Sequence, residues 1–370
     1  MTNGAFQSSW GKAYKYFSLK TTFLVSVFIF ELGSLLCAVA PNSTALIVGR
    51  AIAGVGGAGI VVGTYTIIAF VAEPHKRAML TALVGVAYGF ASVIGPLIGG
   101  VFADKVSWRW CFYINLPIGG LGGATIFFLF QAPPAAKPVS ATLKEKILQM
   151  DPVGICMVMG AIVSFVLAVQ YGGQSKAWNS SEVIGLLVGF AAITAVFVLW
   201  ELYQGERAMI VPRLFKKRTV GISSVFCFLF TGSYLLAIYY LPIYFQSVFG
   251  LSPTMSGVDN LPLILTVTAA LIGSGIFLSA TGLAIPVAVG SAVLTTIGSG
   301  LLYTLDTNTS TGKWVGYQIL SGFGWGFGVQ IPVIAGQSHS LPEDISSTTG
   351  IIASKFICHR IVPIDECIRA

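Results

Sequence analysis

The chain has 370 residues, of which 55% are hydrophobic and only 9% are charged, and its mean hydropathy is +0.83. A soluble domain carries roughly a quarter charged residues, so this composition excludes a water-exposed surface over most of the chain. The net charge of +7 comes from lysines and arginines in short loops between apolar runs, which favours orientation in a membrane over nucleic-acid binding. The six cysteines and three histidines lack metal-ligand spacing, so we expect no metal site and no cofactor.

About ten apolar segments are long enough to cross a bilayer as helices, which takes roughly 20 residues each. They are 21–40, 44–71, 79–103, 111–130, 152–171, 183–200, 219–246, 257–279, 282–305 and 314–335. The loops at 1–20, 72–78, 131–151 and 201–218 carry most of the loop lysines and arginines, which predicts that they and the N-terminus face the cytosol. The fold class is therefore an all-α, multi-pass integral membrane protein. The residues after about 345 contain no apolar run of spanning length, and we expect a short cytosolic tail or a poorly packed stub there.

Two ionisable residues fall well inside the apolar segments, Glu31 and Arg50. Charges in a bilayer are costly, so such residues serve a site or pair with one another. We expect the two to lie at comparable depth on consecutive antiparallel helices. Glu31 is a candidate proton carrier or the partner of Arg50, and a structural, hydrogen-bonded glutamate is the alternative. Arg50 is the stronger candidate for coupling, and the alternative is an arginine neutralised by a buried partner.

Glycine patterns mark helix packing. Gly54 and Gly56 follow Arg50 in the pattern R-x-x-x-G-x-G and leave space for a neighbouring helix or a substrate. The run GFGWGFG at 322–328 predicts two packing faces on one helix, at spacing i, i+4. A formal G-x-G-x-x-G at 54–59 lies inside a membrane segment, so it does not indicate a dinucleotide fold. No Walker A sequence is present, and we expect neither ATP as an energy source nor an enzyme.

The segment YGFASVIGPLIGGVFAD at 88–104 has a glycine-rich pattern with one proline. Gly95 and Gly99 form a small-xxx-small face for close helix packing, and Gly100 follows. Pro96 removes one helix hydrogen bond and predicts a kink or a softer helix. A closely packed, kinked helix would suit a gate that seals one side of a membrane, and packing alone is the alternative.

These motifs resemble the fungal fourteen-helix drug:proton antiporter branch of the major facilitator superfamily. The residues 50–56 resemble its motif B, and Gly95-Pro96-x-x-Gly99-Gly100 resembles motif C, the antiporter motif. The sequences SWRWCFYINLPIGG at 107–120 and GYQILSGFGWGFGVQIPVIAGQ at 316–337 are typical of that branch. The resemblance covers about residues 5–349. It implies a rocker-switch fold of two helix bundles, and export of small organic compounds driven by proton entry, with the arginine that matches Arg50 linked to proton coupling.

The sequence departs from that family in three places. Lys15 stands where motif A elsewhere has an acid, and Leu19 stands where it has an arginine, so we do not expect the usual charge clamp. Helices 1 and most of 2 of the family are expected to be missing, and the pattern ends after about Thr349. The ten segments would then be helices 3–12. The predicted division is a partial N-terminal bundle at 1–130, a loop and linker pair at 131–218, a partial C-terminal bundle at 219–349 and an atypical tail at 350–370.

The function that follows from the resemblance is proton-coupled efflux of drugs or toxic metabolites across the plasma membrane, with the vacuolar membrane as the alternative location. The expected partners are a small organic substrate, protons and the lipid bilayer. Candidate cavity residues are aromatic or amide side chains, namely Tyr65, Tyr88, Tyr239, Gln246 and Gln330. The alternatives are uptake by a related branch, for example of siderophores, and a transport-inactive membrane fragment.

Overall fold

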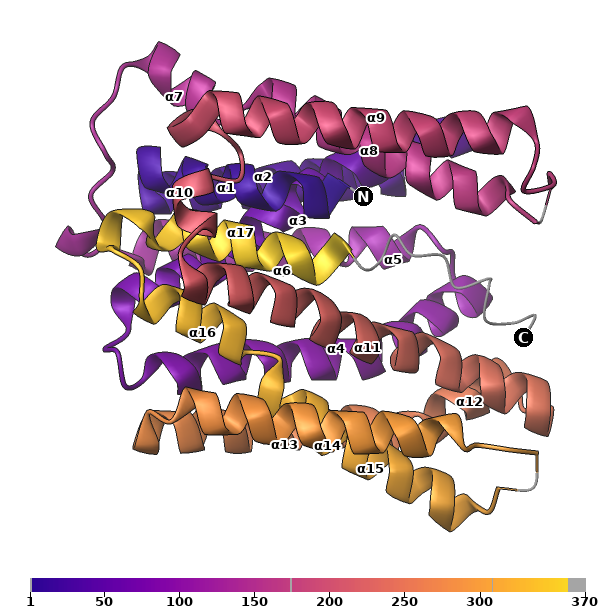
Figure 1. The fold of residues 1–370 in the computed structure, drawn as a ribbon. Helices are drawn as coiled ribbons and strands as arrows, with labels where there is room; N and C mark the ends of the chain where they lie inside the picture. Colours follow the sequence, from indigo (N-terminus) through magenta and orange to yellow (C-terminus); the bar gives the residue numbers. More distant parts are fainter. Residues whose placement is uncertain (1, 174, 308, 359–370) are drawn as a thin grey trace. The chain divides into compact units, whose positions relative to one another are not determined.

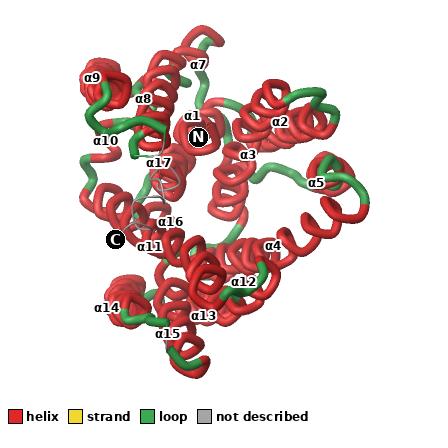
Figure 2. The backbone as a smooth tube through the Cα atoms, turned by 90° about the vertical axis from the view of Figure 1, so that its right-hand side faces the viewer, coloured by secondary structure: helices red, strands yellow, loops and turns green. Residues whose placement is uncertain are grey.

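The computed structural model describes residues 2–173, 175–307 and 309–358. In that part of the chain the regular structure is helical apart from one isolated β-bridge between Gly172 and Lys176 (Figures 1 and 2). The α-helices are α1 (Thr2–Tyr16), α2 (Leu19–Ala38), α3 (Ser43–Val71), α4 (Arg77–Lys105), α5 (Trp110–Tyr113), α6 (Asn115–Leu129), α7 (Leu143–Gln149), α8 (Pro152–Tyr171), α9 (Ser181–Gln204), α10 (Pro212–Phe215), α11 (Arg218–Phe249), α12 (Pro253–Asp259), α13 (Leu261–Thr281), α14 (Ala284–Tyr303), α15 (Thr311–Gly328), α16 (Ile331–Ser338) and α17 (Ile345–Cys358). Three short 3-10 helices are η1 (Pro134–Ala136), η2 (Gly205–Arg207) and η3 (Pro342–Asp344).

The hydrophobic segments of the sequence become the long helices. Among the described residues, nine helical segments are long and apolar enough to cross a membrane, and they coincide with nine of the predicted spans. The tenth predicted span falls on α4. Within the described residues its apolar stretch covers Arg77–Ser92, which is shorter than the other nine. The all-α multi-pass prediction is confirmed.

Two terminal predictions are wrong. Residues 1–20 were expected to form a cytosolic loop, but Thr2–Tyr16 form the helix α1, and more than half of its residues are buried. The segment after 345 was expected to be a tail or a stub, but it forms α17, in which Ile351, Ile352 and Ala353 are almost completely buried. The two helices α1 and α17 pack closely along each other (Figure 1). Each helix therefore buries a face of the other, and neither would be buried by itself. Residues 359–370 of the predicted tail lie outside the described residues.

Contacts divide the chain into two compact units. The first contains residues 1–70, 109–224 and 339–370, and the second contains residues 71–108 and 225–338. In the first unit, α1 packs on α17, α2 packs on α6, and α8 packs on α9. In the second, α13 packs on both α4 and α15, and α15 packs on α14. The predicted division of the chain into two partial bundles and a linker stays a prediction.

The glycine run in α15 packs on two neighbours, as the spacing predicts. A Cβ atom on Gly322 or Gly326 would meet backbone carbonyl oxygens of α13, at 3.0 and 2.5 Å respectively. On Gly324 it would meet the backbone nitrogen of a residue of α14 at 2.6 Å, and on Gly328 a serine oxygen of the same helix at 2.6 Å. Alternate glycines therefore seat α15 between α13 and α14 at distances that no other residue type permits.

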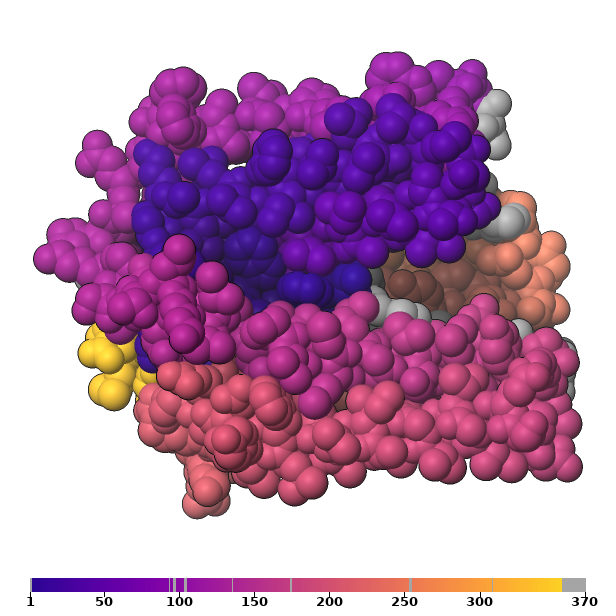
Figure 3. Space-filling view, turned by 90° about the horizontal axis from the view of Figure 1, so that it is seen from above, coloured from indigo at the N-terminus to yellow at the C-terminus, as the bar shows by residue number. Residues whose placement is uncertain are grey.

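The helices α8 and α9 pack on each other, and α8 also packs on α1. Apart from Val183 and Glu201, the side chains of α9 are at least partly exposed, as expected for a helix that faces lipid. Figure 3 shows the residues of this pair as one continuous edge of the face seen from above. Where α8 is connected to α9, Lys176 of the connecting loop forms an ion pair with Glu182 in the first turn of α9.

Candidate functional site

The Arg50 side chain is exposed on α3 and lies near an aromatic ring of α5. Its guanidinium carbon is 6.0 Å from the centroid of the Phe112 ring, within the range of a cation–π contact. Among the described residues it forms no ion pair. An arginine is permanently charged, so this position holds a fixed positive charge beside an aromatic face.

The two glycines after Arg50 make room for neighbouring helices. A Cβ atom on Gly56 would lie 2.7 Å from both the Cα atom of Phe30 and the carbonyl oxygen of Ser26 in α2. Gly54 faces the start of α1, where a Cβ atom would meet the side chain of Thr2. Of the two uses that the sequence left open for this space, the structure shows helix packing.

The carboxyl group of Glu31, in the first unit, has an unusual environment for an acidic side chain. Neither of its oxygens is accessible to solvent, and neither has a hydrogen-bond partner among the described residues. The group lies directly against Gly119 of α6, where an added Cβ atom would be 2.6 Å from the Cδ atom of Glu31. Glycine at this position therefore creates the space that the carboxyl group occupies.

Of the alternatives that the sequence left open for Glu31, pairing with Arg50 is not seen in the described residues, because the register of α2 and α3 separates the two side chains. Gly33 lies opposite Ala53, and Cys37 lies opposite Gly49. Arg50 is consequently level with the last turn of α2, and at a rise of 1.5 Å per residue it lies about 8 Å along the helix axis from Glu31. The structure thus keeps the acid and the base apart, on the same pair of helices.

The branch-typical segment at 107–120 attaches α5 and α6 to α2. The Arg109 guanidinium donates a hydrogen bond to the carbonyl oxygen of Ala40 at 3.0 Å. Asn115 donates to the Ser34 hydroxyl at 3.2 Å, and Gly119, one turn later, accommodates Glu31. Sequence reasoning recognised the segment but did not find these roles. The i, i+4 spacing of Asn115 and Gly119 was the available signal, because it places both on one helix face.

The motif C residues lie in the second half of α4, which runs without interruption from Arg77 to Lys105. A Cβ atom on Gly95 or Gly100 would meet no described heavy atom within 4 Å, and Gly99 is partly exposed. The close packing that the sequence predicted at Gly95 is therefore not seen among the described residues. The side chain of Pro96 lies outside them, and the antiporter role of the motif stays a prediction.

The three candidate cavity tyrosines fall in different units. Tyr65 lies on α3 in the first unit and is half-buried, whereas Tyr88 on α4 and Tyr239 on α11 belong to the second unit and are exposed. Each unit thus presents at least one tyrosine that can contact an amphipathic molecule.

The two candidate glutamines differ in their surroundings. Gln246 is exposed and donates to the Ser256 hydroxyl at 2.9 Å. Gln330 is buried, and its side-chain oxygen has no hydrogen-bond partner among the described residues. Sequence reasoning missed Trp325, whose indole donates to the Ser233 hydroxyl at 2.9 Å. A tryptophan inside the glycine run of α15 was the signal.

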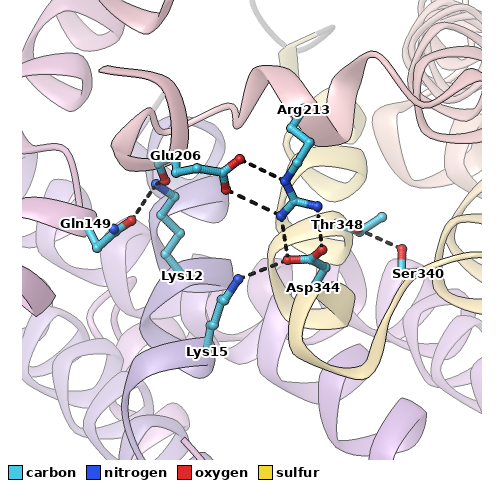
Figure 4. A network of polar contacts seen from close by, with 8 residues as sticks. All are labelled: Lys12, Lys15, Gln149, Glu206, Arg213, Ser340, Asp344 and Thr348. Carbon is cyan, nitrogen blue, oxygen red and sulfur yellow. Dashed lines mark hydrogen bonds and ion pairs between the residues drawn. The ribbon is translucent and has the colours of Figure 1, made fainter. Parts of the chain in front are cut away.

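The altered motif A does form a charged contact. Lys15, which stands in place of the usual acid, donates to a carboxylate oxygen of Asp344 at 2.9 Å (Figure 4). An ion pair of the opposite polarity thus stands where the family has its usual clamp. The pairing joins residues that are 329 positions apart, so no local pattern reveals it.

The chain matches a known family along most of its length. Residues 1–356 match the family model described as Major Facilitator Superfamily. The chain belongs to the major facilitator superfamily. It is 57% identical over 352 residues to the MFS-type transporter grgE of a Penicillium species, covering 95% of this chain and 62% of the relative. It is 56% identical to the probable efflux pump gsfJ of Penicillium aethiopicum, covering 95% of this chain and 63% of that relative. The chain thus spans a little over three fifths of the length of these fungal relatives.

Solved structures agree on the fold. The human organic anion transporter MFSD10 superposes with a TM-score of 0.68 over 97% of this chain and 73% of its own, at 13% identity. The proton:xylose symporter XylE superposes with a TM-score of 0.62 over 96% of this chain and 74% of its own, also at 13% identity. The superfamily fold and the multi-pass membrane location are therefore established.

Proposed function

We propose that this chain belongs to a proton-coupled exporter that moves small organic compounds across a membrane in exchange for protons, by alternating access. The efflux direction is supported by fungal relatives named as efflux pumps that are 44% to 56% identical to this chain. The chain is a transporter polypeptide rather than an enzyme, with the bilayer as its solvent.

The observation that carries the proton-coupling proposal is the carboxyl group of Glu31. Its oxygens are buried, and neither has a hydrogen-bond partner in the part of the chain that the structure describes. A charge on such a group must be compensated by a proton or by a cation. A movement of α6 against α2 would change the contact of the carboxyl group with Gly119 and admit water or a cation. Glu31 would then exchange its proton in one conformation and hold it in the other.

Arg50 complements Glu31 in this proposal. It lies on α3, about 8 Å along the helix axis from the carboxyl group, and its charge does not titrate. A change of register between α2 and α3 of one to two turns would bring the two groups level. Such a change would release the proton, because a nearby cation favours the ionised carboxylate.

The substrate surface is proposed to include Tyr65 in the first unit and Tyr88, Tyr239, Gln246 and Gln330 in the second. Tyrosines offer apolar area with a polar tip, and amides both donate and accept hydrogen bonds. These groups suit amphipathic organic molecules. Their contribution is testable by alanine substitution, which should raise the substrate concentration for half-maximal flux.

Flux measurements in proteoliposomes test the proposal. With rhodamine 6G as the probe and an imposed pH gradient, we expect export that Glu31→Gln and Arg50→Ala abolish. Lys76→Gln serves as the control, because Lys76 pairs with Glu73 in an exposed contact of 2.8 Å. Accumulation in the opposite direction would indicate an uptake transporter, and the absence of any gradient-driven flux would indicate a transport-inactive chain. Either result would refute the proposal for this polypeptide.

A further inference from the structure

The short helix α7, which precedes the α8–α9 pair, turns its polar face toward the protein. Glu145 accepts two hydrogen bonds from the Arg207 guanidinium, at 2.9 and 2.7 Å. One turn later, Gln149 is 7% exposed and accepts from the Lys12 ammonium at 3.4 Å. The spacing i, i+4 places Glu145 and Gln149 on one face of the helix, and this face is held against η2 and α1.

The opposite face of α7 is apolar and exposed. Leu143 is 68% exposed, and Ile147, one turn later on the same face, is 55% exposed. A surface helix of a soluble protein buries its apolar face and exposes its polar face, so α7 is oriented the other way round. This orientation suits a helix that lies in a membrane interface, where the apolar face enters the boundary of the acyl chains.

The position of α7 beside a membrane-spanning helix is fixed by Asp151. Only Met150 and Asp151 separate α7 from α8, and Asp151 has a φ of 49°, a left-handed conformation that ends one helix before the next begins. Its carboxylate accepts hydrogen bonds from the backbone N–H of Gly154 at 3.0 Å and from the Trp200 indole of α9 at 2.9 Å. The turn is thus attached to both α8 and α9, and α7 lies beside the end of this pair (Figure 1).

The segment around α10 adds positive charge next to α7. Both helices contact η2, and the acids near η2 are already compensated within the protein. Arg207 holds Glu145, and Arg213 donates to the Glu206 carboxylate at 2.8 Å (Figure 4). The remaining cations of this region therefore have no acid left to pair with at close range.

Three of these cations are at least partly exposed lysines, Lys144, Lys216 and Lys217. None of them forms an ion pair in the part of the chain that the structure describes. Phe215 precedes the last two and is itself exposed. We call the group of exposed apolar and basic side chains on these two segments the α7–α10 surface; its members are Leu143, Lys144, Ile147, Phe215, Lys216 and Lys217.

We propose that the α7–α10 surface binds anionic phospholipids of the cytoplasmic leaflet, with the apolar side chains among the acyl chains and the three lysines at the phosphates. The apolar face by itself would accept any phospholipid. The unpaired lysines add the selectivity, because a cation beside an anionic leaflet is attracted to the surface. Charge complementarity and the position beside the end of α8 therefore favour a lipid over a second protein as the occupant. The inference needs the membrane location of the chain and does not depend on the proposed transport.

Quenching by brominated lipids tests lipid contact at a single position. Ile147→Cys, in the full chain with the six native cysteines replaced by alanine, is labelled with a dansyl group and reconstituted into phosphatidylcholine vesicles. Brominated phosphatidylserine or brominated phosphatidylcholine is then added as the quencher. The ratio of their relative binding constants, obtained from the quenching curves, measures the preference for the anionic lipid.

Ile285→Cys is the matched control position. Ile285 is 79% exposed near the start of α14, and the alternation of the spans after α11 places this end on the cytosolic side as well. The connection before it, residues 280–283, contains no lysine or arginine. Its label should therefore be quenched equally by the two lipids.

At residue 147 we expect a preference for phosphatidylserine of at least about tenfold. Lys144→Gln and Lys216→Gln should each lower it about two- to fivefold, since each lysine near an anionic surface contributes up to about a fivefold gain in affinity. Lys144→Arg keeps the charge and should keep the preference. Lys76→Gln, which removes a lysine outside the α7–α10 surface that is already paired with Glu73, should also leave it unchanged. Raising the salt concentration from about 0.1 to 1 M, which shortens the screening length from about 10 to 3 Å, should lower the preference without any substitution.

Three results would overturn the proposal. Absence of quenching at residue 147 by either brominated lipid would show that water or a protein covers α7. Equal quenching by the two lipids would show apolar contact without recognition of the headgroup. A preference that persists when all three lysines are replaced by glutamine would place the anion-binding charge elsewhere. Because no substrate is present, loss of substrate flux would leave the lipid site standing, and loss of the lipid preference would leave the proposed transport untouched.

Discussion

Substitution of Gly56 by alanine tests the packing of α2 on α3, which sets the positions of Glu31 and Arg50. The new Cβ atom would lie 2.7 Å from the Cα atom of Phe30 and from the carbonyl oxygen of Ser26. Carbon atoms pack best at about 3.5–4.0 Å, so the helices would have to separate by about 1 Å. The obstructing atoms belong to the backbone, and no rotamer change can relieve the contact.

The magnitude follows from this geometry. Overpacking costs typically about 1–3 kcal/mol, and a gap of about 1 Å also forfeits up to half of the dispersion energy of the neighbouring contacts. The higher helix propensity of alanine returns at most about 1 kcal/mol. We expect a net loss of about 2–3 kcal/mol of stability, which corresponds to a fall of about 5 °C in the apparent Tm.

The assay is thermal unfolding in detergent, followed by the loss of the monodisperse peak in size-exclusion chromatography. Gly57→Ala is the matched control on the same helix, because the described atoms that its Cβ atom would meet are the side-chain amide nitrogen of Asn3 at 3.0 Å and a ring atom of Phe30 at 3.8 Å. A flexible side chain can move away, so its Tm should change by less than about 2 °C. Equal effects of the two substitutions would refute the assignment of Gly56 to the helix contact.

Three further predictions follow. Gly119→Ala should impair stability, since its Cβ atom would lie 2.6 Å from the Cδ atom of Glu31, and Glu31→Ala should rescue it, whereas Gly120→Ala, which meets no described atom within 4 Å, should be neutral. Burial alone would raise the pKa of Asp344, but the hydrogen bonds from Arg213 and Lys15 outweigh burial and hold this pKa below its ordinary value. Protection of the peptide 339–356 from hydrogen exchange should therefore persist from pH 7 to 5 and be lost as the pH falls below about 4. Burial lowers the pKa of Lys12 from 10.5 to about 8 against the opposing attraction of Glu201, Asp151 and Glu206, so the unfolded state binds more protons between these values and stability should rise there by up to about 3 kcal/mol.

Each of these has a contrary result. Failure of the Glu31→Ala rescue would show that Gly119 matters for another contact. Acid sensitivity that persists in Asp344→Asn would place the titrating group elsewhere. A stability that stays flat between pH 8 and 10 in the native chain, or that rises equally in Lys12→Met, would show that Lys12 is not the responsible group.

The sequence predicted the membrane helices because hydrophobic length and glycine spacing are local properties. Gly322 and Gly326 show this well: their i, i+4 spacing alone places them on one face, and that face packs on α13. The same reasoning failed for Glu31 and Arg50, since the relative depth of two helices depends on which glycines interlock between them.

The terminal helices and the ion pair between Lys15 and Asp344 could not be predicted for a different reason. The helix α1 has little apolar surface of its own, with a mixed sequence that includes Lys12 and Lys15, and it is stabilised by packing on α17. The partner of Lys15 lies 329 residues away. Contacts of this kind arise from tertiary structure, which local propensity does not encode.

The central claim is the exchange of protons for substrate, and the lumenal pH of substrate-loaded proteoliposomes tests it most directly. Rhodamine 6G is loaded inside, the vesicles are diluted into dye-free buffer without a pH gradient, and a trapped ratiometric reporter that does not overlap the dye follows the pH. Antiport predicts that the lumen acidifies as the dye leaves, and that Glu31→Gln abolishes the acidification while Lys76→Gln preserves it. Dye efflux that leaves the lumenal pH unchanged, or that makes the lumen more alkaline, would contradict the account.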